Sequence, residues 1–221
     1  MEATVERTPS RGTAWGGVVF AVAYFVGVTL MLGPTPSDEH SGQPVKYAAD
    51  WNRVFADSGK RNQMLVGAYV LAIACIAIVV FGSHLRDRLA AAGAATSGRL
   101  AFAGSIMFAT ITLAGGTAVV WLAGAKAFGS TPLPRGELAY LAPQLGYALL
   151  HLGGGATAAL KQVASGFGSA RSRALPAWLG WAGVVVGVLV FAFGVFFMPM
   201  ILLVLWVLIA GIVGLRRPFT A

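Results

Sequence analysis

His151 is the residue of this chain best suited to chemistry, because it falls near the middle of an apolar segment. Tyr147 and Gln144 precede it by four and seven residues, a spacing that places the three side chains on one face of an α-helix. An ionisable residue within a membrane segment is a candidate functional residue, since lipid solvates it poorly. The alternative is structural: a neutral imidazole that hydrogen-bonds to a neighbouring helix, for instance to Ser105, Thr110 or Thr112.

The remaining histidines and acidic residues give weaker signals. A haem between helices usually needs two axial ligands at one depth, whereas His40 falls in a loop and His84 at the end of a segment. Asp38 and Glu39 adjoin His40, but three consecutive residues on a flexible loop do not converge easily on a metal. No paired-carboxylate, nucleophile-elbow, HExxH or phosphate-loop pattern occurs. The sequence therefore predicts no enzyme activity, no cofactor and no metal.

The composition indicates an integral membrane protein. Of 221 residues, 57% are hydrophobic and 11% are charged, and the mean hydropathy is +0.75. Soluble domains carry about 25% charged residues, so lipid must surround most of this chain. The net charge of +8 lies mainly between apolar segments, which indicates loops that set membrane orientation rather than nucleic-acid binding. The single cysteine, Cys75, excludes an intrachain disulfide.

The elements that must position the polar residues are transmembrane helices, because about 20 apolar residues span the hydrocarbon core. We predict an all-α bundle that forms a single transmembrane domain over residues 1–221. Its six predicted helices are residues 14–33, 64–84, 100–124, 141–160, 178–196 and 200–215. The last apolar stretch is about 57 Å long as a helix, nearly twice the core thickness, so we expect a turn near Pro199. A single kinked last helix, which gives five spans, is the alternative.

The basic residues predict that both termini lie in the cytoplasm. With six spans, ten of the 16 Lys and Arg residues fall on the side of the termini, and this excess marks the cytoplasmic side. We therefore expect a multi-pass protein of the plasma membrane. No Asp or Glu falls within a predicted span, which argues against a carboxylate-based pump or an acidic channel filter. Lys161 is expected at a span end, where its ammonium can reach the interface.

The loop of residues 34–63 is predicted to contain a short amphipathic helix at about residues 44–58. Pro44 suits its first position and Gly59 its end, and charged residues spaced for ion pairs form one face. The apolar face consists of Tyr47, Trp51, Val54 and Phe55. On the outer side of the membrane this helix is either a structural cap on the bundle or a lid over a binding site.

The chain has 29 glycines, many of them within spans. Small residues let helices approach closely in lipid, where no hydrophobic force drives helices together. The clearest groups are Gly16–Gly17, Gly115–Gly116, Gly153–Gly155, Gly183 with Gly187, and Gly211 with Gly214. They serve either internal packing or an interface with another subunit, and spacing alone does not separate the two. Tryptophans near span ends are expected to anchor the interface: Trp15, Trp121, Trp178, Trp181 and Trp206.

The sequence LPAWLGWAG at Leu175–Gly183 resembles the LPxWLGWxG entry to the penultimate helix in a broad group of bacterial membrane proteins, abundant in high-GC Gram-positive bacteria. Gly146–Leu149 and Gly67–Tyr69 fit the same pattern, as does the proline-bounded loop after the first helix. The resemblance covers most of the chain after Ala14. It implies six helices, with the last apolar stretch divided in two, and it implies no activity, substrate or catalytic residue.

These observations leave three functional hypotheses. The first is a non-enzymatic accessory or scaffolding subunit, whose partner is another membrane protein or a second copy of the chain. It is motivated by the missing catalytic motifs, the short cytoplasmic loops and the glycine-rich faces. The second is a binder or transporter of a small molecule or lipid, with a site at Gln144, Tyr147 and His151 beneath the 44–58 helix. The third is a redox or quinone-linked subunit that uses His151. All three share the lipid bilayer as a partner.

Overall fold

The computed structural model describes residues 11–129, 132–134, 136–194 and 196–216, and no strand occurs among them. The α-helices are α1 (Arg11–Leu32), α2 (Pro44–Ala56), α3 (Ser58–Ala91), α4 (Ala95–Phe128), α5 (Leu138–Ala148), α6 (Gly154–Ser172), α7 (Ala177–Phe193) and α8 (Phe197–Arg216). A π-helical segment, Leu149–Gly153, joins α5 to α6, and a short 3₁₀ turn, Asp38–His40, precedes α2. The prediction of an all-helical chain is confirmed.

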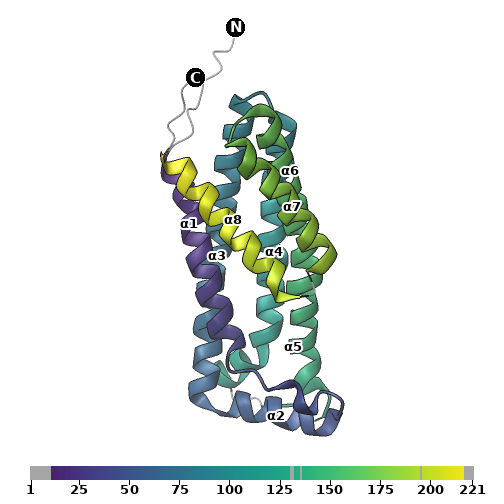
Figure 1. The fold of residues 1–221 in the computed structure, drawn as a ribbon. Coiled ribbons are helices and arrows are strands. Elements are labelled where there is room, and N and C mark those ends of the chain that lie inside the picture. The colour runs from purple at the N-terminus through teal and green to yellow at the C-terminus, as the bar shows by residue number, and fades with distance from the viewer. Residues whose placement is uncertain (1–10, 130–131, 135, 195, 217–221) are drawn as a thin grey trace.

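The helices form one elongated bundle, and α2 lies across one end of it (Figure 1). Within the bundle α1 packs along α3, α3 along α4, and α4 along α6. The hairpin of α7 and α8 covers one side, with α7 against α6 and α8 against α1. The start of α1 and the end of α8 lie at the end opposite α2. We call that end the terminal end and the other the α2 end.

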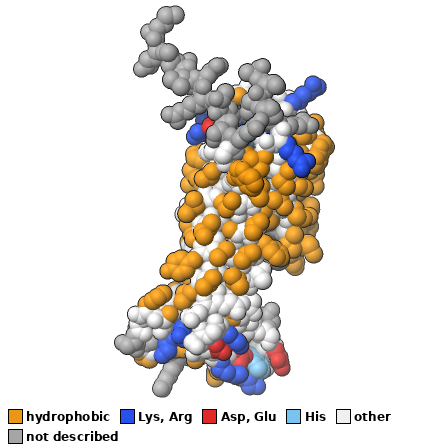
Figure 2. All heavy atoms as spheres, turned by 90° about the vertical axis from the view of Figure 1, so that its left-hand side faces the viewer, with side chains coloured by type: hydrophobic (Ala, Val, Ile, Leu, Met, Phe, Trp, Pro, Cys, Tyr) orange, Lys and Arg blue, Asp and Glu red, His pale blue; other side chains and the backbone are white. Residues whose placement is uncertain are grey.

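Four helices are long and apolar enough to cross a membrane: α1, α3, α4 and α8. Charged side chains gather at both ends of the molecule, and an apolar belt lies between them (Figure 2). On α4 the belt runs from the exposed Leu100 to the exposed Trp121, about 32 Å, which matches a hydrocarbon core of about 30 Å. Ile111 lies half-way along this stretch and marks the middle of the belt.

The last apolar stretch forms two helices, α7 and α8, and not one kinked helix. The two helices run antiparallel (Figure 1). The indole Nε1 of Trp206 in α8 donates a hydrogen bond to the carbonyl oxygen of Leu179 in α7 at 2.8 Å. Trp206 is therefore buried within the hairpin, and its prediction as an interfacial anchor is wrong. Trp15, Trp121, Trp178 and Trp181 are exposed.

The α7–α8 hairpin reaches only part-way toward the α2 end (Figure 1). A methyl group built on Gly155 of α6 would lie 3.6 Å from the Cα of Gly194, where α7 ends. A methyl group built on Gly153, which directly precedes α6, would lie 2.8 Å from the side chain of Ile111. The start of α6 is therefore at the middle of the belt. The turn between α7 and α8 therefore lies near mid-depth, and the α2 half of the bundle consists of α1, α3, α4 and α5.

Several helices extend beyond their predicted ends. α3 begins at Ser58 because Asp57 caps it, its carboxylate accepting a hydrogen bond from the Lys60 amide at 3.1 Å. Charged residues such as Arg61 and Arg86 continue the helix past the apolar belt, where hydropathy gives no signal for an end. Three basic residues used to predict orientation, Arg7, Arg135 and Arg217, lie outside the described residues.

The grouped glycines of the spans pack helices of this chain against one another. A methyl group on Gly16 would approach Ala77 and Phe81 of α3, within 2.8 Å of backbone atoms. Gly183 and Gly187 face α6, and a methyl group on Gly211 would lie 3.2 Å from the Ala14 carbonyl. Gly115 meets Gly146 of α5. These glycines serve internal packing, which removes one reason for expecting an interface with another subunit.

Candidate functional site

Gln144, Tyr147 and His151 do not converge on one site. Gln144 is exposed, and its Nε2 donates a hydrogen bond to the Tyr47 hydroxyl of α2 at 3.2 Å. Tyr147 and His151 are half-buried, with ring centroids 6.2 Å apart. The π-helical segment intervenes, and its extra residue per turn rotates α6 relative to α5. Gln144 and Tyr147 both lie on α5 before this segment, so the separate partner of Gln144 comes from the docking of α2 and not from the rotation.

The α2 face predicted to be apolar is buried against the bundle. Trp51 and Phe55 stack at 5.3 Å, and the Tyr47 ring lies 5.5 Å from Tyr140 of α5. Asn52 holds the helix further through a hydrogen bond to the Pro134 carbonyl at 3.2 Å. All four predicted residues, Tyr47, Trp51, Val54 and Phe55, are less than 5% exposed. None of them lines the cavities described below.

His151 hydrogen-bonds within its own helix, and not to α4. Its Nδ1 donates to the Tyr147 carbonyl oxygen at 2.9 Å. Of the partners suggested from the sequence, Ser105 and Thr110 donate to carbonyls of their own helix instead. The imidazole lines a gap of about 10 Å³ enclosed by Tyr24, Val28, Leu32, Leu150, His151 and Met200, which we call the His151 gap. This volume holds about one water molecule.

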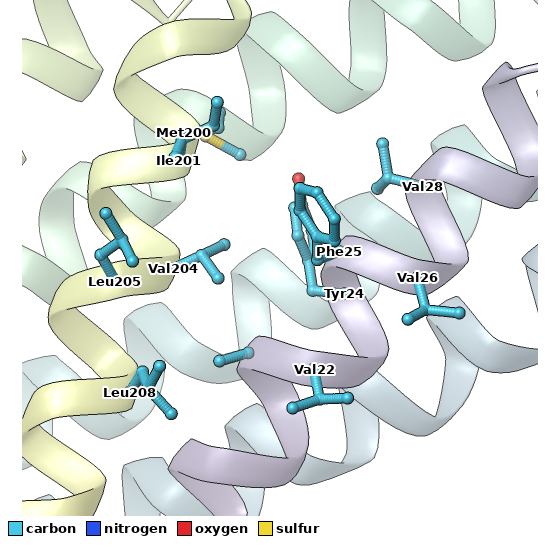
Figure 3. Close-up of a pocket in the computed structure, with 11 residues that line it drawn as sticks. Val22, Tyr24, Phe25, Val26, Val28, Met200, Ile201, Val204, Leu205 and Leu208 are labelled. Atoms are coloured by element: carbon cyan, nitrogen blue, oxygen red, sulfur yellow. The ribbon is translucent and has the colours of Figure 1, made fainter.

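A larger cavity opens beside the His151 gap, between α1 and α8 (Figure 3). Its volume is about 320 Å³. We call it the α1–α8 groove; its walls are Ala21, Val22, Tyr24, Phe25, Val26 and Val28 of α1 with Met200, Ile201, Val204, Leu205 and Leu208 of α8. Tyr24, Val28 and Met200 line both the groove and the His151 gap, so the gap is the inner end of the groove.

Tyr24 contributes a polar hydroxyl at the inner end of the groove, and the sequence did not predict it as a site residue. Its side chain is 6% exposed, and its ring packs against Phe20 and Phe108 at centroid distances of 5.3 and 6.2 Å. Within the described part of the chain its hydroxyl has no hydrogen-bond partner. The available signal was a lone phenolic hydroxyl in the middle of the first apolar segment, where nothing nearby in sequence could satisfy it.

Lys161 is buried in the terminal half of the bundle, which corrects its prediction at a span end. Its side chain is 1% exposed because α6 continues to Ser172 and packs closely on Gly104 of α4. The ammonium lies 5.8 Å from the Phe81 ring centroid and 5.5 Å from that of Trp206. Its Nζ donates a long hydrogen bond of 3.4 Å to Gln162 Oε1. Among the described residues no carboxylate pairs with it.

A second groove lies between α3 and α4, with a volume of about 230 Å³. Thr112 lines it, and the Thr112 hydroxyl is buried without a partner among the described residues. The groove shares no wall residue with the α1–α8 groove, so it offers a matched comparison. No group of three or more His, Cys, Asp or Glu side chains within the described ranges could hold a metal ion. His40 instead bonds Asp50 at 2.7 Å.

Comparisons of the chain with family models, with curated proteins and with solved structures found no match.

Proposed function

We propose that this chain is a non-enzymatic membrane protein that binds an apolar molecule taken sideways from the bilayer. The observation that supports this proposal is the α1–α8 groove. Its volume of about 320 Å³ falls within the range of small-molecule sites, about 300–1,000 Å³. Its walls are apolar, and polar atoms occur only at its inner end, in the His151 gap. A site of this kind suits a ligand dissolved in lipid.

Access to the groove is from the side of the bundle. Val22, Phe25 and Leu205 line the groove and are also exposed on the outer surface of the bundle. In a bilayer these residues face acyl chains, so a ligand enters without crossing water. The α2 helix covers the end of the bundle and not this side (Figure 1). Binding therefore requires no movement of α2. Of the two roles predicted for that helix, cap and lid, this proposal adopts the cap.

In this proposal six segments are embedded in the plasma membrane: α1, α3, α4, the combined α5–α6 helix, α7 and α8. Both termini are cytoplasmic, because among the described residues the terminal end carries seven Lys and Arg against five at the α2 end, with the buried Lys161 left out, and an excess of basic residues favours the cytoplasmic side. The α7–α8 hairpin enters from the cytoplasmic side and turns back near mid-depth. The α2 end then faces outward.

The other hypotheses from the sequence remain predictions with less support. An accessory subunit was expected partly from glycine-rich faces, and the glycines pack inside this chain. A redox or quinone-linked subunit was expected from His151, but the His151 gap is too small for a quinone ring. A stoichiometric protein partner in a pull-down from native membranes would favour the accessory-subunit hypothesis over the binder.

Native mass spectrometry of the protein extracted in mild detergent tests the binder. We expect the wild-type chain to retain a specific lipophilic molecule at one copy per chain. Leu205→Trp should remove it, because Leu205 is half-exposed on the groove wall and a larger ring fills the groove without entering the core. Val188→Trp is the matched control, since Val188 is exposed on α7 and lines neither groove.

The two variants separate a specific ligand from the surrounding lipid. Loss of the retained molecule in Leu205→Trp alone supports the groove as the site. Equal retention in the wild type and both variants would mean that the molecule is lipid bound elsewhere on the surface, and the proposed function would then fail.

A further inference from the structure

Two polar atoms at the inner end of the α1–α8 groove have no partner among the described residues. The first is the Tyr24 hydroxyl, whose oxygen is directed toward the end of the groove formed by Val28 and Met200 (Figure 3). The second is Nε2 of His151. Because Nδ1 donates to the Tyr147 carbonyl at 2.9 Å, the neutral ring carries its proton there, and Nε2 is a hydrogen-bond acceptor.

These two atoms limit which hydrogen bonds a ligand can form in the gap. A phenolic hydroxyl donates or accepts, whereas an unprotonated Nε2 only accepts. A ligand atom between Tyr24 and His151 must therefore donate to His151, and it satisfies Tyr24 best by accepting the phenolic proton. An alcohol oxygen does both at once. A ketone or quinone carbonyl has no proton to donate to His151.

The size of the His151 gap limits the polar group of the ligand. A volume of about 10 Å³ admits a group no larger than a water molecule or a hydroxyl. A phosphate, a sugar or a glycerol headgroup exceeds this space. Beyond the gap, the α1–α8 groove continues along α1 to Ala21 and along α8 to Leu208 with apolar walls, so the rest of the ligand is a hydrocarbon chain.

The ligand must also be uncharged. Among the described residues, no Lys, Arg, Asp or Glu lines the groove or the gap. His151 lies near the middle of the apolar belt, since a methyl group on Gly194 at the hairpin turn would lie 3.4 Å from its carbonyl oxygen. A charged group at that depth is strongly disfavoured without a partner. A fatty-acid carboxylate therefore does not fit.

We propose that the α1–α8 groove binds an uncharged long-chain alcohol of alkyl or isoprenoid type, with its hydroxyl in the His151 gap. Tyr24 donates a hydrogen bond to the alcohol oxygen, and the alcohol donates to His151 Nε2. The hydrocarbon chain lies between α1 and α8. This inference rests on the proposed function, because it names the ligand class of the same groove.

Photolabelling in vesicles tests the inference with three probes that share one hydrocarbon chain carrying a diazirine. The first ends in a hydroxyl, the second in a methyl ether and the third in a methyl group. We expect the alcohol to label α1 and α8 peptides at roughly three- to tenfold lower concentration than the ether, the effect of a neutral hydrogen bond. His151→Phe should remove most of this preference, because only the alcohol donates to Nε2, whereas Tyr24→Phe should remove most of the preference of both the alcohol and the ether over the methyl-ended probe. Thr112→Val, in the α3–α4 groove, should retain both preferences.

The probes separate failure of the inference from failure of the proposed function. Equal labelling of α1 and α8 by all three probes would overturn the alcohol, with water filling the gap, while the groove would remain a binding site. Absence of labelling on α1 and α8 with every probe would overturn both. Unchanged labelling of Tyr24→Phe by the methyl-ended probe shows that the variant is folded and that a loss of preference is specific.

Discussion

The indole Nε1 of Trp206 lies 2.8 Å from the carbonyl oxygen of Leu179, and this hydrogen bond joins the two arms of the α7–α8 hairpin. Leu179 and Trp206 are each no more than 3% exposed, so the bond is shielded from water and from lipid. The Trp206 ring also forms one wall of the space around Lys161. A residue expected at the membrane interface therefore holds the hairpin to the bundle.

Replacing Trp206 with Phe keeps an aromatic ring but removes the donor. We expect the free energy of unfolding to fall by about 1–2 kcal/mol from the lost hydrogen bond. Thermal unfolding in detergent measures this, and Trp181→Phe is the control because Trp181 is exposed on the same hairpin. Equal effects of the two substitutions would contradict a special role for the Trp206 bond.

Gly27 of α1 and Gly67 of α3 let the two backbones touch. A methyl group on Gly27 would lie 2.7 Å from the Leu71 amide nitrogen, and one on Gly67 would lie 2.8 Å from the Gly27 carbonyl. We expect Gly67→Ala to cost about 1–3 kcal/mol through overpacking. Gly124→Ala, whose nearest neighbour would be 3.9 Å away, should be neutral or stabilising in a helix. A neutral Gly67→Ala in the same unfolding assay would show that the helices can separate at no cost.

Lys161 should reduce stability where it stands. Burial of an ammonium without a carboxylate partner is costly, and two cation–π contacts, each worth about 2 kcal/mol when desolvated, offset only part of that cost. We expect Lys161→Met, which keeps the length of the side chain, to raise the unfolding temperature. Lys126→Met, on an exposed residue, should leave it unchanged. A lower unfolding temperature for Lys161→Met would mean that the aromatic contacts outweigh burial.

The α2 helix should be tightly docked. Trp51 of α2 is fully buried against the bundle. Trp51→Ala should therefore lower the free energy of unfolding by about 3–5 kcal/mol and increase proteolysis in the 34–63 loop. Val45 is 82% exposed on the same helix, and Val45→Ala should have little effect. Similar proteolysis of both variants would indicate that α2 lifts away from the bundle readily, as a lid would.

The proposed orientation predicts opposite labelling of two introduced cysteines. Val45→Cys in α2 should react with an impermeant maleimide on intact cells, and Ala95→Cys at the start of α4 only after lysis. The native Cys75 is 2% exposed within the bundle and should give little background. The reverse pattern would place the α2 end in the cytoplasm.

Hydropathy was sufficient to predict the helical class and the approximate position of each apolar segment. It carried no information where helices continue into water, as α3 does on either side of residues 64–84. The end of the fourth predicted segment, next to Lys161, was misplaced for the same reason, since α6 continues past Lys161 to Ser172. The burial of Lys161 depends on Phe81 and Trp206, which are distant in sequence.

The candidate site was less predictable than the fold. The spacing of Gln144, Tyr147 and His151 implied one face, and the Tyr147 and His151 rings do lie side by side, 6.2 Å apart. Gln144 instead bonds to Tyr47 of α2, a contact that local spacing could not predict. His151 was singled out from the sequence, but Tyr24, which lines the same gap, lies more than a hundred residues away in the chain. The two reach one cavity only because α1 and α8 both pack beside the π-helical segment that holds His151.

The short α7–α8 hairpin has a consequence for the shape that the protein presents to each leaflet. The half that holds the start of α1 also holds α6, α7 and α8, whereas the α2 half contains only α1, α3, α4 and α5 in the apolar belt. With the proposed six embedded segments, the chain would occupy more area in one leaflet than in the other, which is the shape of a wedge. Many copies in one patch would bend the membrane so that the leaflet around the hairpin lies on the convex side.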